Sequence, residues 1–207
     1  MSSYITVKES SEYEFEDRKS VFLGFAAPAS KEEEAIAFIN KIKKKYPDAR
    51  HWVYAYVLRE NSTTRYSDDR EPQGTAGMPV LDIIRKNGCT DTVIVVVRYF
   101  GGILLGTGGL VHAYSEAALG ALKAAKIIEY NIYSEITLTL NYSDYQKALP
   151  ITVKYEFLPI DTDFQADVKI IGSVLKDKCD EFIAKVTEIT GGRCAFEKIN
   201  EFFGYRE

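Results

Sequence analysis

The sequence predicts an α+β protein of two domains. Its 207 residues, 46% of them hydrophobic, are enough for one large core or two smaller ones. Patterns typical of helices and of strands are mixed along the chain, and after Asn131 the order of elements starts again. Charge divides at the same place, since residues 1–132 have no net charge and residues 133–207 carry the whole net charge of −4. We therefore expect one domain in residues 1–132 and a second in residues 133–207.

Composition narrows the class of protein. No apolar stretch approaches the roughly 20 residues of a membrane-spanning helix, and the start of the chain has no apolar signal-peptide segment, so we expect a cytoplasmic protein that contacts no membrane. The three cysteines, Cys89, Cys179 and Cys194, are widely separated, which favours reduced thiols and predicts neither a structural metal nor a cofactor. Because basic and acidic residues nearly balance, binding to RNA requires a local patch.

The first domain begins with strand-forming residues over Tyr13–Ala27 and a helix that starts at Ser30. Glu33 is placed to complete a capping box at the start of this helix, and Pro47 ends it. The apolar stripe of the helix consists of Ala35, Phe38, Ile39, Ile42 and Tyr46. A further strand is expected over Trp52–Leu58.

A lysine cluster lies near the end of this helix and consists of Lys41, Lys43, Lys44 and Lys45. Cations at that end interact favourably with the helix dipole, so the cluster fits a solvated helix face. It also fits a contact with RNA or with an acidic partner.

A long polar segment from Arg59 to Gly77 is unusual inside a compact domain unless it has a function. Asp68, Asp69 and Glu71 form an acidic loop with three carboxylates in four residues. That arrangement suits a hard cation or acid and base catalysis, and it equally suits solvated side chains. A short helix is predicted next, over Met78–Lys86.

The most informative feature is a loop rich in glycine. A Val/Ile run that leads to Arg98 predicts a strand buried on both faces. Five glycines then follow within nine residues, together with Thr107: Gly101, Gly102, Gly106, Gly108 and Gly109. The next residues recur at helical spacing, and the expected buried face is Leu110, Ala113, Tyr114, Ala117, Ala118, Ala121 and Leu122.

The order of strand, glycine loop and helix suits an anion. Glycines have no Cβ and allow positive φ, so a phosphate oxygen can reach backbone N–H groups, and a helix N-terminus favours negative charge. The same glycines also serve tight turns and close packing. Neither a Walker loop nor a dinucleotide fingerprint is present, because Thr107 and Gly108 replace the Walker Lys and Ser/Thr, and Val111 replaces the third glycine of the fingerprint. The candidate anion- or RNA-binding residues are Arg98, Gly101, Gly102, Gly106, Thr107, Gly108, Gly109 and His51.

The second domain has the order βαββαβ, which is that of a ferredoxin-like unit. The expected elements are a strand over Ile136–Tyr142, a helix over Ser143–Lys154, strands over Glu156–Ile160 and Ala166–Leu175 that turn at Asp161–Asp163, a helix over Phe182–Ile189 and a strand over Arg193–Phe203. No residue in this domain has the pattern of a catalytic site.

Three separated segments resemble the YigZ/IMPACT family in their order and content. They are DARHW (Asp48–Trp52), SDDREPQGTAGMP (Ser67–Pro79) and VVVRYFGGILLGTGGLVHAY (Val95–Tyr114). The resemblance spans nearly the whole chain and implies an N-terminal domain with the fold of the second domain of ribosomal protein S5. It also implies a ferredoxin-like C-terminal domain similar to one in elongation factor G. Eukaryotic relatives regulate translation through a ribosome-associated partner of an initiation-factor kinase.

Three positions depart from the family's usual pattern. Members usually have Lys at the position of Leu105, a basic residue at His112 and often Gly at Arg70. Two positive charges are therefore missing from the glycine loop, in which we expect Leu105 to be exposed, and one is added to the acidic loop. Arg98, the loop backbone and His51 remain as candidate contacts.

We expect a translation-associated regulator that binds ribosomes, structured RNA or a translation factor, with these loops as its contact surface. The alternative is an enzyme that acts on a phosphorylated small molecule, because the S5-like fold is shared with small-molecule kinases whose glycine loops bind ATP phosphates. A phosphate or nucleotide ligand belongs to this alternative, for which Cys89 with His51 or His112 is a candidate nucleophile and base. A pure protein-interaction module is a third interpretation.

Overall fold

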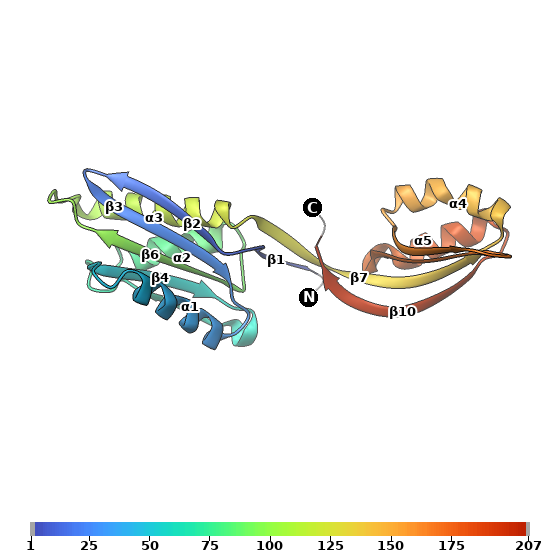
Figure 1. Cartoon of the computed structure of the whole chain (residues 1–207), viewed down its shortest axis with the longest axis horizontal. Helices are drawn as coiled ribbons and strands as arrows, with labels where there is room; N and C mark the ends of the chain where they lie inside the picture. The colour runs from blue at the N-terminus through green and yellow to red at the C-terminus, as the bar shows by residue number, and fades with distance from the viewer. Residues whose placement is uncertain (1–2, 206–207) are drawn as a thin grey trace. The chain divides into compact units, whose positions relative to one another are not determined.

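The computed structural model describes residues 3–205 and shows the α+β architecture that the sequence predicts (Figure 1). The chain divides into two compact units between Glu129 and Tyr130. The N-terminal unit is Tyr4–Glu129, and the C-terminal unit consists of Ser3 and the described residues from Tyr130 onward. The division lies close to the boundary after residue 132 that the charge pattern indicates.

The N-terminal unit is a five-stranded antiparallel sheet with helices on both faces. The strands lie in the order β2-β3-β6-β4-β5. Their bounds are Ser11–Asp17 (β2), Ser20–Pro28 (β3), Thr92–Tyr99 (β6), His51–Val57 (β4) and Thr64–Ser67 (β5). The other elements are β1 (Ser3–Val7), α1 (Glu32–Lys45), a short 3-10 turn (Glu60–Ser62), α2 (Gly77–Lys86) and α3 (Gly106–Ala124). Figure 1 shows α1 on one face of the sheet and α2 and α3 on the other.

The middle strand β6 is buried along almost its whole length because both of its faces are covered, as the Val/Ile run predicts. Over Val93–Val97, odd-numbered residues pack in the core beneath α1, and even-numbered residues pack in the core beneath α2 and α3. Side chains alternate along a strand, so Arg98 lies on the α2 and α3 side. This placement brings the arginine inside the unit. The buried face of α3 consists of the seven residues that the helical spacing indicates.

The strand-forming residues at the start of the unit form two strands. The region Tyr13–Ala27 is a hairpin of β2 and β3, which turns at Arg18 and Lys19 with φ of 46° and 66°. Sequence patterns missed this turn because neither residue is a typical turn former.

The cap of α1 differs from the one that the sequence predicts. Glu34, not Glu33, accepts hydrogen bonds from the Ser30 backbone N–H at 2.7 Å and from the Ser30 hydroxyl at 3.0 Å. These bonds lower the pKa of the Glu34 carboxyl. The helix therefore begins two residues later than Ser30, at Glu32.

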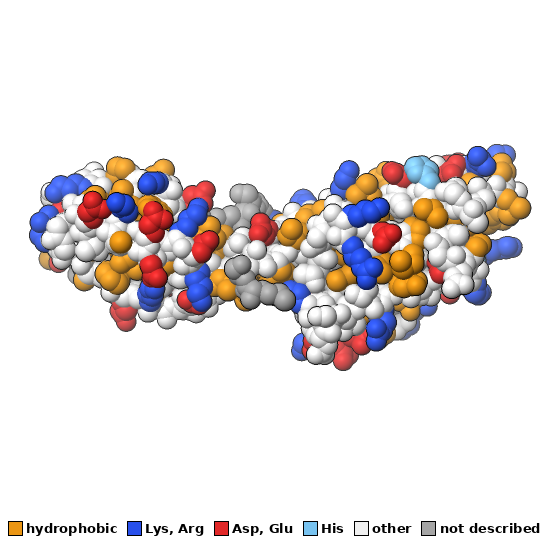
Figure 2. Space-filling view, turned by 180° about the vertical axis from the view of Figure 1, so that it is seen from behind, with side chains coloured by type: hydrophobic (Ala, Val, Ile, Leu, Met, Phe, Trp, Pro, Cys, Tyr) orange, Lys and Arg blue, Asp and Glu red, His pale blue; other side chains and the backbone are white. Residues whose placement is uncertain are grey.

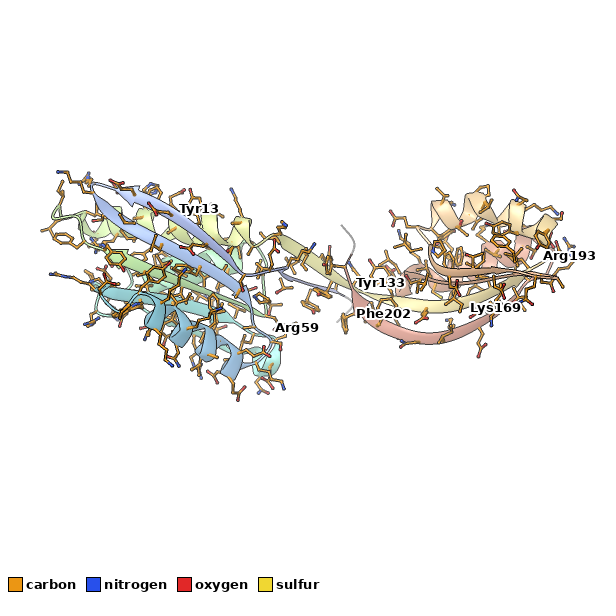
Figure 3. All side chains as sticks on the ribbon, viewed as in Figure 1. Tyr13, Arg59, Tyr133, Lys169, Arg193 and Phe202 are labelled. Atoms are coloured by element: carbon orange, nitrogen blue, oxygen red, sulfur yellow. The ribbon has the colours of Figure 1, made fainter. Side chains whose placement is uncertain are left out.

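The C-terminal unit has the βαββαβ order that the sequence predicts. Its elements are β7 (Ile127–Leu140), α4 (Tyr142–Lys154), β8 (Leu158–Phe164), β9 (Val168–Leu175), α5 (Lys176–Ile189) and β10 (Ala195–Gly204). The strands lie in the order β10-β7-β9-β8, and β1 also pairs with β7. The rings of Tyr133 on β7 and Phe202 on β10 stack with centroids 5.8 Å apart (Figure 3).

The β8–β9 hairpin turns later than expected. Asp161, Thr162 and Asp163 are paired residues of β8, and the turn comes at residues 165–167, where the Gln165 N–H donates to the Asp167 carbonyl at 3.1 Å. The polar composition of β8 explains the error, because this edge strand is mostly exposed and lacks an apolar pattern.

One charged group supports the C-terminal unit from within. The carboxylate of Asp144, on the first turn of α4, is 1% exposed and accepts two hydrogen bonds from Arg193, both at 2.8 Å. The Arg193 guanidinium, aided by Lys147 and Asn141, holds the pKa of the Asp144 carboxyl well below its usual range. Arg193 follows α5, so the pair ties the two helices together at the end labelled in Figure 3.

This pair predicts a dependence of stability on pH. Because the pKa of Asp144 is depressed on folding, its contribution is fully present above the ordinary value near 3.8 and is lost as pH falls through the folded-state pKa. Thermal unfolding of wild type and Asp144→Asn, followed by circular dichroism, should show a difference in Tm that narrows as pH falls from about 5 to about 2. A difference that is the same at every pH would contradict this role.

Candidate functional site

The centre of the site is a buried ion pair between Arg98 and Glu71. Arg98 ends the buried run of β6 and pairs across the sheet with Phe22 on β3 and His51 on β4. Its Nη1 donates to Glu71 Oε1 at 2.6 Å, and the two side chains are 7% and 4% exposed. The Tyr114 hydroxyl, from α3, donates to the same oxygen at 2.8 Å. Glu71 therefore joins the loop before α2 to both the sheet and α3.

Burial makes each partner necessary to the others. A buried charge is tolerated only when it is paired and hydrogen-bonded, because it has lost its contact with water. Burial, and then the charge of Glu71, raise the pKa of the Tyr114 hydroxyl, so this group is a donor at neutral pH. Arg98 Nε is buried without a hydrogen-bond partner among the described residues. The central carbon of the guanidinium lies over the rings of Phe22 and Phe100, 5.4 and 5.7 Å from their centroids.

His51 lies at the edge of this ion pair. Its Nδ1 is 2.8 Å from the carbonyl oxygen of Asp69, and since a carbonyl only accepts, Nδ1 carries a proton. Its Nε2 is 3.8 Å from Glu71 Oε1, and the side chain is 19% exposed. The structure thus brings together His51, Arg98 and Glu71, which come from three separate motifs of the sequence.

The acidic loop does not gather its carboxylates on one point. Asp68 accepts from the backbone N–H groups of Gly74, Ala76 and Gly77 at 3.0, 3.1 and 2.8 Å. Asp69 Oδ2 accepts from the Trp52 N–H at 2.7 Å. Asp68 therefore holds the start of α2, Asp69 holds the loop to β4, and Glu71 neutralises Arg98. Among the described residues, the structure has no group of three or more His, Cys, Asp or Glu that could hold a metal ion.

The glycines of the loop between β6 and α3 have different roles. A Cβ at Gly101 would lie 2.0 Å from the backbone of Lys19, so this glycine permits close packing on the β2–β3 turn. Gly102 and Gly106 have φ of 86° and 73°, which favours glycine, and space above them is open. Gly108 does not have positive φ, and a Cβ there would meet nothing within 4 Å.

The helix α3 begins at Gly106, inside the segment of residues 101–109 that the sequence predicts to be a loop. Gly106, Thr107, Gly108 and Gly109 form its first turn, and Leu105 precedes them without a side-chain cap. Gly106, Thr107 and Gly108 are exposed, so the first backbone N–H groups of α3 lie at the surface. This part of the loop keeps the geometry of a helix N-terminus that can accept an anion.

Leu105 is not exposed, contrary to the sequence-based expectation. It is 8% exposed and packs in the core of the N-terminal unit, whereas its neighbour Leu104 is 82% exposed. A lysine at position 105 would therefore have to bury its stem or displace the loop. His112 is exposed and lies edge-on to the ring of Phe15, with centroids 6.0 Å apart.

Part of the lysine cluster has partners in its own unit. Lys45 Nζ donates to Glu12 at 3.0 Å, and it also lies 4.9 Å from the ring centroid of Tyr46. Lys43 Nζ lies 5.9 Å from the ring centroid of Tyr54. These contacts, at the C-terminal end of α1, favour the interpretation of a solvated helix face.

Cys89 does not have the surroundings of a nucleophile. It is 3% exposed, and burial raises the pKa of its thiol to about 11. Its Sγ donates to the Asn87 carbonyl oxygen at 3.7 Å, while His51 and His112 have the other partners described above. A neutral, buried thiol is inert compared with a thiolate beside a base.

Sequence analysis missed two parts of the site. The first is Tyr114, whose place on the buried face of α3 was predicted but whose hydroxyl gave no signal of its bond to Glu71. The second is an open pocket of about 440 Å³ at the start of β4, lined by Ala49, Arg50, His51, Trp52 and Arg70. The DARHW segment and the acidic loop contain these residues, but their meeting depends on the fold.

Removing one member of the buried ion pair should be strongly destabilising. In Glu71→Ala, Arg98 is left as an unpaired buried charge, and the expected loss is about 3–5 kcal/mol of unfolding free energy. In Glu71→Gln with Arg98→Met, no charge is buried and part of the loss should be recovered. Urea unfolding measures the unfolding free energy of both variants. An equal loss of unfolding free energy in the two would show that Arg98 is not held by Glu71.

The glycines of the loop should differ in their tolerance of a methyl group. Gly108→Ala introduces a better helix former into open space on α3 and should raise stability by about 0.4–1 kcal/mol. Gly101→Ala forces a clash with the Lys19 backbone and should lower stability. Thermal unfolding compares the two variants, and a destabilised Gly108→Ala would contradict the open space above that residue.

Comparison with known proteins supports the resemblance. The Impact N-terminal domain matches residues 18–122, and a domain of unknown function, DUF1949, matches residues 138–193. A solved structure titled as the crystal structure of a hypothetical protein is 32% identical, with a TM-score of 0.60 over 97% of this chain and 98% of that chain.

Named relatives match over most or half of the chain. The IMPACT family member YvyE of Bacillus subtilis is 36% identical over 93% of this chain and 89% of its own length. YigZ of Escherichia coli is 34% identical over 90% of this chain and 93% of its own length. The Protein IMPACT homolog of Saccharomyces cerevisiae is 31% identical over 52% of this chain and 43% of its own length. The two matching domains and the two bacterial relatives, which match over most of their own length, show that the chain belongs to the IMPACT family.

Proposed function

We propose that this protein is a translation-associated regulator that acts by binding ribosomes, through RNA or a bound translation factor, and not by catalysis. Membership of the IMPACT family supports a role in translation, because the resemblance carries that expectation from the eukaryotic relatives. The proposal rests on an exposed apolar surface at the loop between β6 and α3.

This loop surface consists of Phe100, Ile103, Leu104 and Val111, which are 41%, 43%, 82% and 39% exposed. Its position is set from both sides, because Gly101 packs on the β2–β3 turn and Leu105 packs in the core. A loop held on a rigid scaffold is a common place for a binding site, and clustered exposed apolar side chains indicate contact with a partner.

The polar residues of the family motifs have internal roles, which is why we favour binding over catalysis. Arg98, Glu71 and Tyr114 hold one another, and Asp68 and Asp69 hold backbone N–H groups. On the face that Figure 2 shows, Lys and Arg side chains are interspersed with Asp and Glu over both units, without a continuous basic area among the residues drawn. We therefore expect apolar contacts to contribute to binding beside charge.

A second candidate function is an enzyme that acts on a phosphorylated small molecule through the glycine loop. One observation favours it: the first turn of α3 is exposed and uncapped, with open space above Gly106 and Gly108. No nucleophile and base pair accompanies this helix start among the described contacts of Cys89, His51 and His112.

The test is sedimentation of the protein with ribosomes of its source organism over a series of salt concentrations. Leu104→Ser should weaken binding by about 10-fold, because a leucine side chain buried on binding contributes roughly 1.5–3 kcal/mol. Val153→Ser is the matched control, because Val153 is 78% exposed and lies on α4 of the other unit. This variant should bind ribosomes as wild type does. Both variants should unfold as wild type does because neither side chain is buried.

The outcomes separate the candidate functions. Absence of sedimentation at low salt would reject the proposal. Equal ribosome binding by wild type and Leu104→Ser would show that this loop surface is not the contact.

A further inference from the structure

The open pocket at the start of β4 places two arginines, a histidine and a tryptophan together. It is lined by Ala49, Arg50, His51, Trp52 and Arg70, and encloses about 440 Å³. Arg50 and Arg70 come from loops 20 residues apart, and Arg70 Nη2 donates to the Arg50 carbonyl oxygen at 2.6 Å. None of the residues that line this pocket belongs to the loop surface.

We propose that this pocket binds a phosphate group, with the guanidinium groups of Arg50 and Arg70 as the main contacts. Guanidinium groups offer paired N–H donors whose geometry matches the oxygens of a phosphate. The proposal goes beyond the proposed function, because it names a different site and a ligand chemistry that ribosome binding at the β6–α3 loop does not require.

The backbone that carries Arg70 is strained, which supports a built site. Asp69 and Arg70 have φ of 39° and 71°, in the region that favours glycine. Such conformations persist where the surroundings hold them, and they are frequent at ligand sites. Two bonds to β4 hold Asp69, from the Trp52 N–H to Oδ2 at 2.7 Å and from His51 Nδ1 to the carbonyl at 2.8 Å.

The charges that face the pocket leave an excess of positive charge. Among the described residues, Arg50 has no carboxylate within ion-pair distance, and its side chain belongs to an exposed residue. Arg70 has Asp69 Oδ2 at 3.7 Å, a long contact between a 68% exposed and a 22% exposed side chain. Glu71, behind His51, is already paired with Arg98. Two arginines thus line the pocket, and the one carboxylate in contact with either of them, that of Asp69, also accepts the Trp52 N–H.

Trp52 also lines the pocket. Its Nε1 donates to the Tyr46 carbonyl oxygen at 3.0 Å, which fixes the indole and leaves it no free donor. An aromatic residue at the pocket suits the organic part of a phosphate ester, whereas the two arginines suit the phosphate itself.

The test uses the intrinsic fluorescence of the intact protein, because Trp52 is the one tryptophan of the chain. Pyrophosphate is titrated into the protein at low salt, with sodium chloride of equal ionic strength as the reference, and calorimetry measures the same binding independently. We expect a saturable change in Trp52 fluorescence and weaker binding at higher salt.

Three variants locate the site. Arg50→Gln and Arg70→Gln should each weaken pyrophosphate binding by about 10-fold or more, the usual effect of losing a charged hydrogen bond. Arg70→Lys should lose less, because it keeps the charge without the paired donors. Arg85→Gln is the matched control, since this exposed arginine on α2 does not line the pocket and its loss should leave binding unchanged. Thermal unfolding confirms that each variant is folded.

A second arm distinguishes the source of the phosphate. A short single-stranded RNA that competes with pyrophosphate and is weakened by the same substitutions identifies an RNA backbone, whereas pyrophosphate binding without competition identifies a free phosphate compound. The proposal is overturned if neither probe binds at millimolar concentration by fluorescence and calorimetry, or if Arg85→Gln weakens binding as much as Arg50→Gln does. Neither result bears on ribosome binding through Leu104, so the two proposals fail separately.

Discussion

The ion pair of Arg98 and Glu71 is the interaction on which the rest of the N-terminal unit depends. It places a charge beneath α2 and α3, where both side chains are buried, and the charge is tolerated because one carboxylate oxygen accepts hydrogen bonds from both Arg98 and Tyr114. The strand, the helix and the loop before α2 therefore meet at one oxygen. The loop before α2, which Asp69 already ties to β4, is thereby also fixed to α3 by a buried charge that needs its partner.

This constraint explains why the exposed features lie where they do. With Glu71 fixed, Asp69 is carried to the start of β4, and the next residue, Arg70, extends over Arg50. On the other side of Arg98 the chain leaves β6, packs Gly101 on the β2–β3 turn and returns Leu105 to the core. The buried ion pair, the bonds of Asp69 and the packing of Gly101 and Leu105 together fix the surroundings of the pocket at β4 and of the loop surface before α3. The motif residues with the strongest chemistry are inside, and their neighbours are at the surface.

The sequence predicts the parts of this arrangement that depend on local periodicity. The buried strand β6, the seven-residue face of α3 and the βαββαβ order follow from patterns that extend over many residues. Prediction fails where the outcome depends on a partner far along the chain. No local pattern indicates a partner for Arg98, because Glu71 is 27 residues away along the chain. The three carboxylates of the acidic loop suggest one site, although each has a different partner. Leu105 is another case, since only the packing of the loop shows that it is buried.

Positions 105 and 70, where we expected departures from the family pattern, have opposite relations to their surroundings. At position 105 the chain has an apolar residue in an apolar place, which agrees with the local packing. At position 70 it has arginine at a φ of 71°, where glycine would be less strained. The first departure follows the local environment and the second opposes it. An arginine at a φ that favours glycine is better explained by what its side chain contacts. The Arg70 guanidinium donates to the Arg50 carbonyl oxygen at the open pocket that both arginines line.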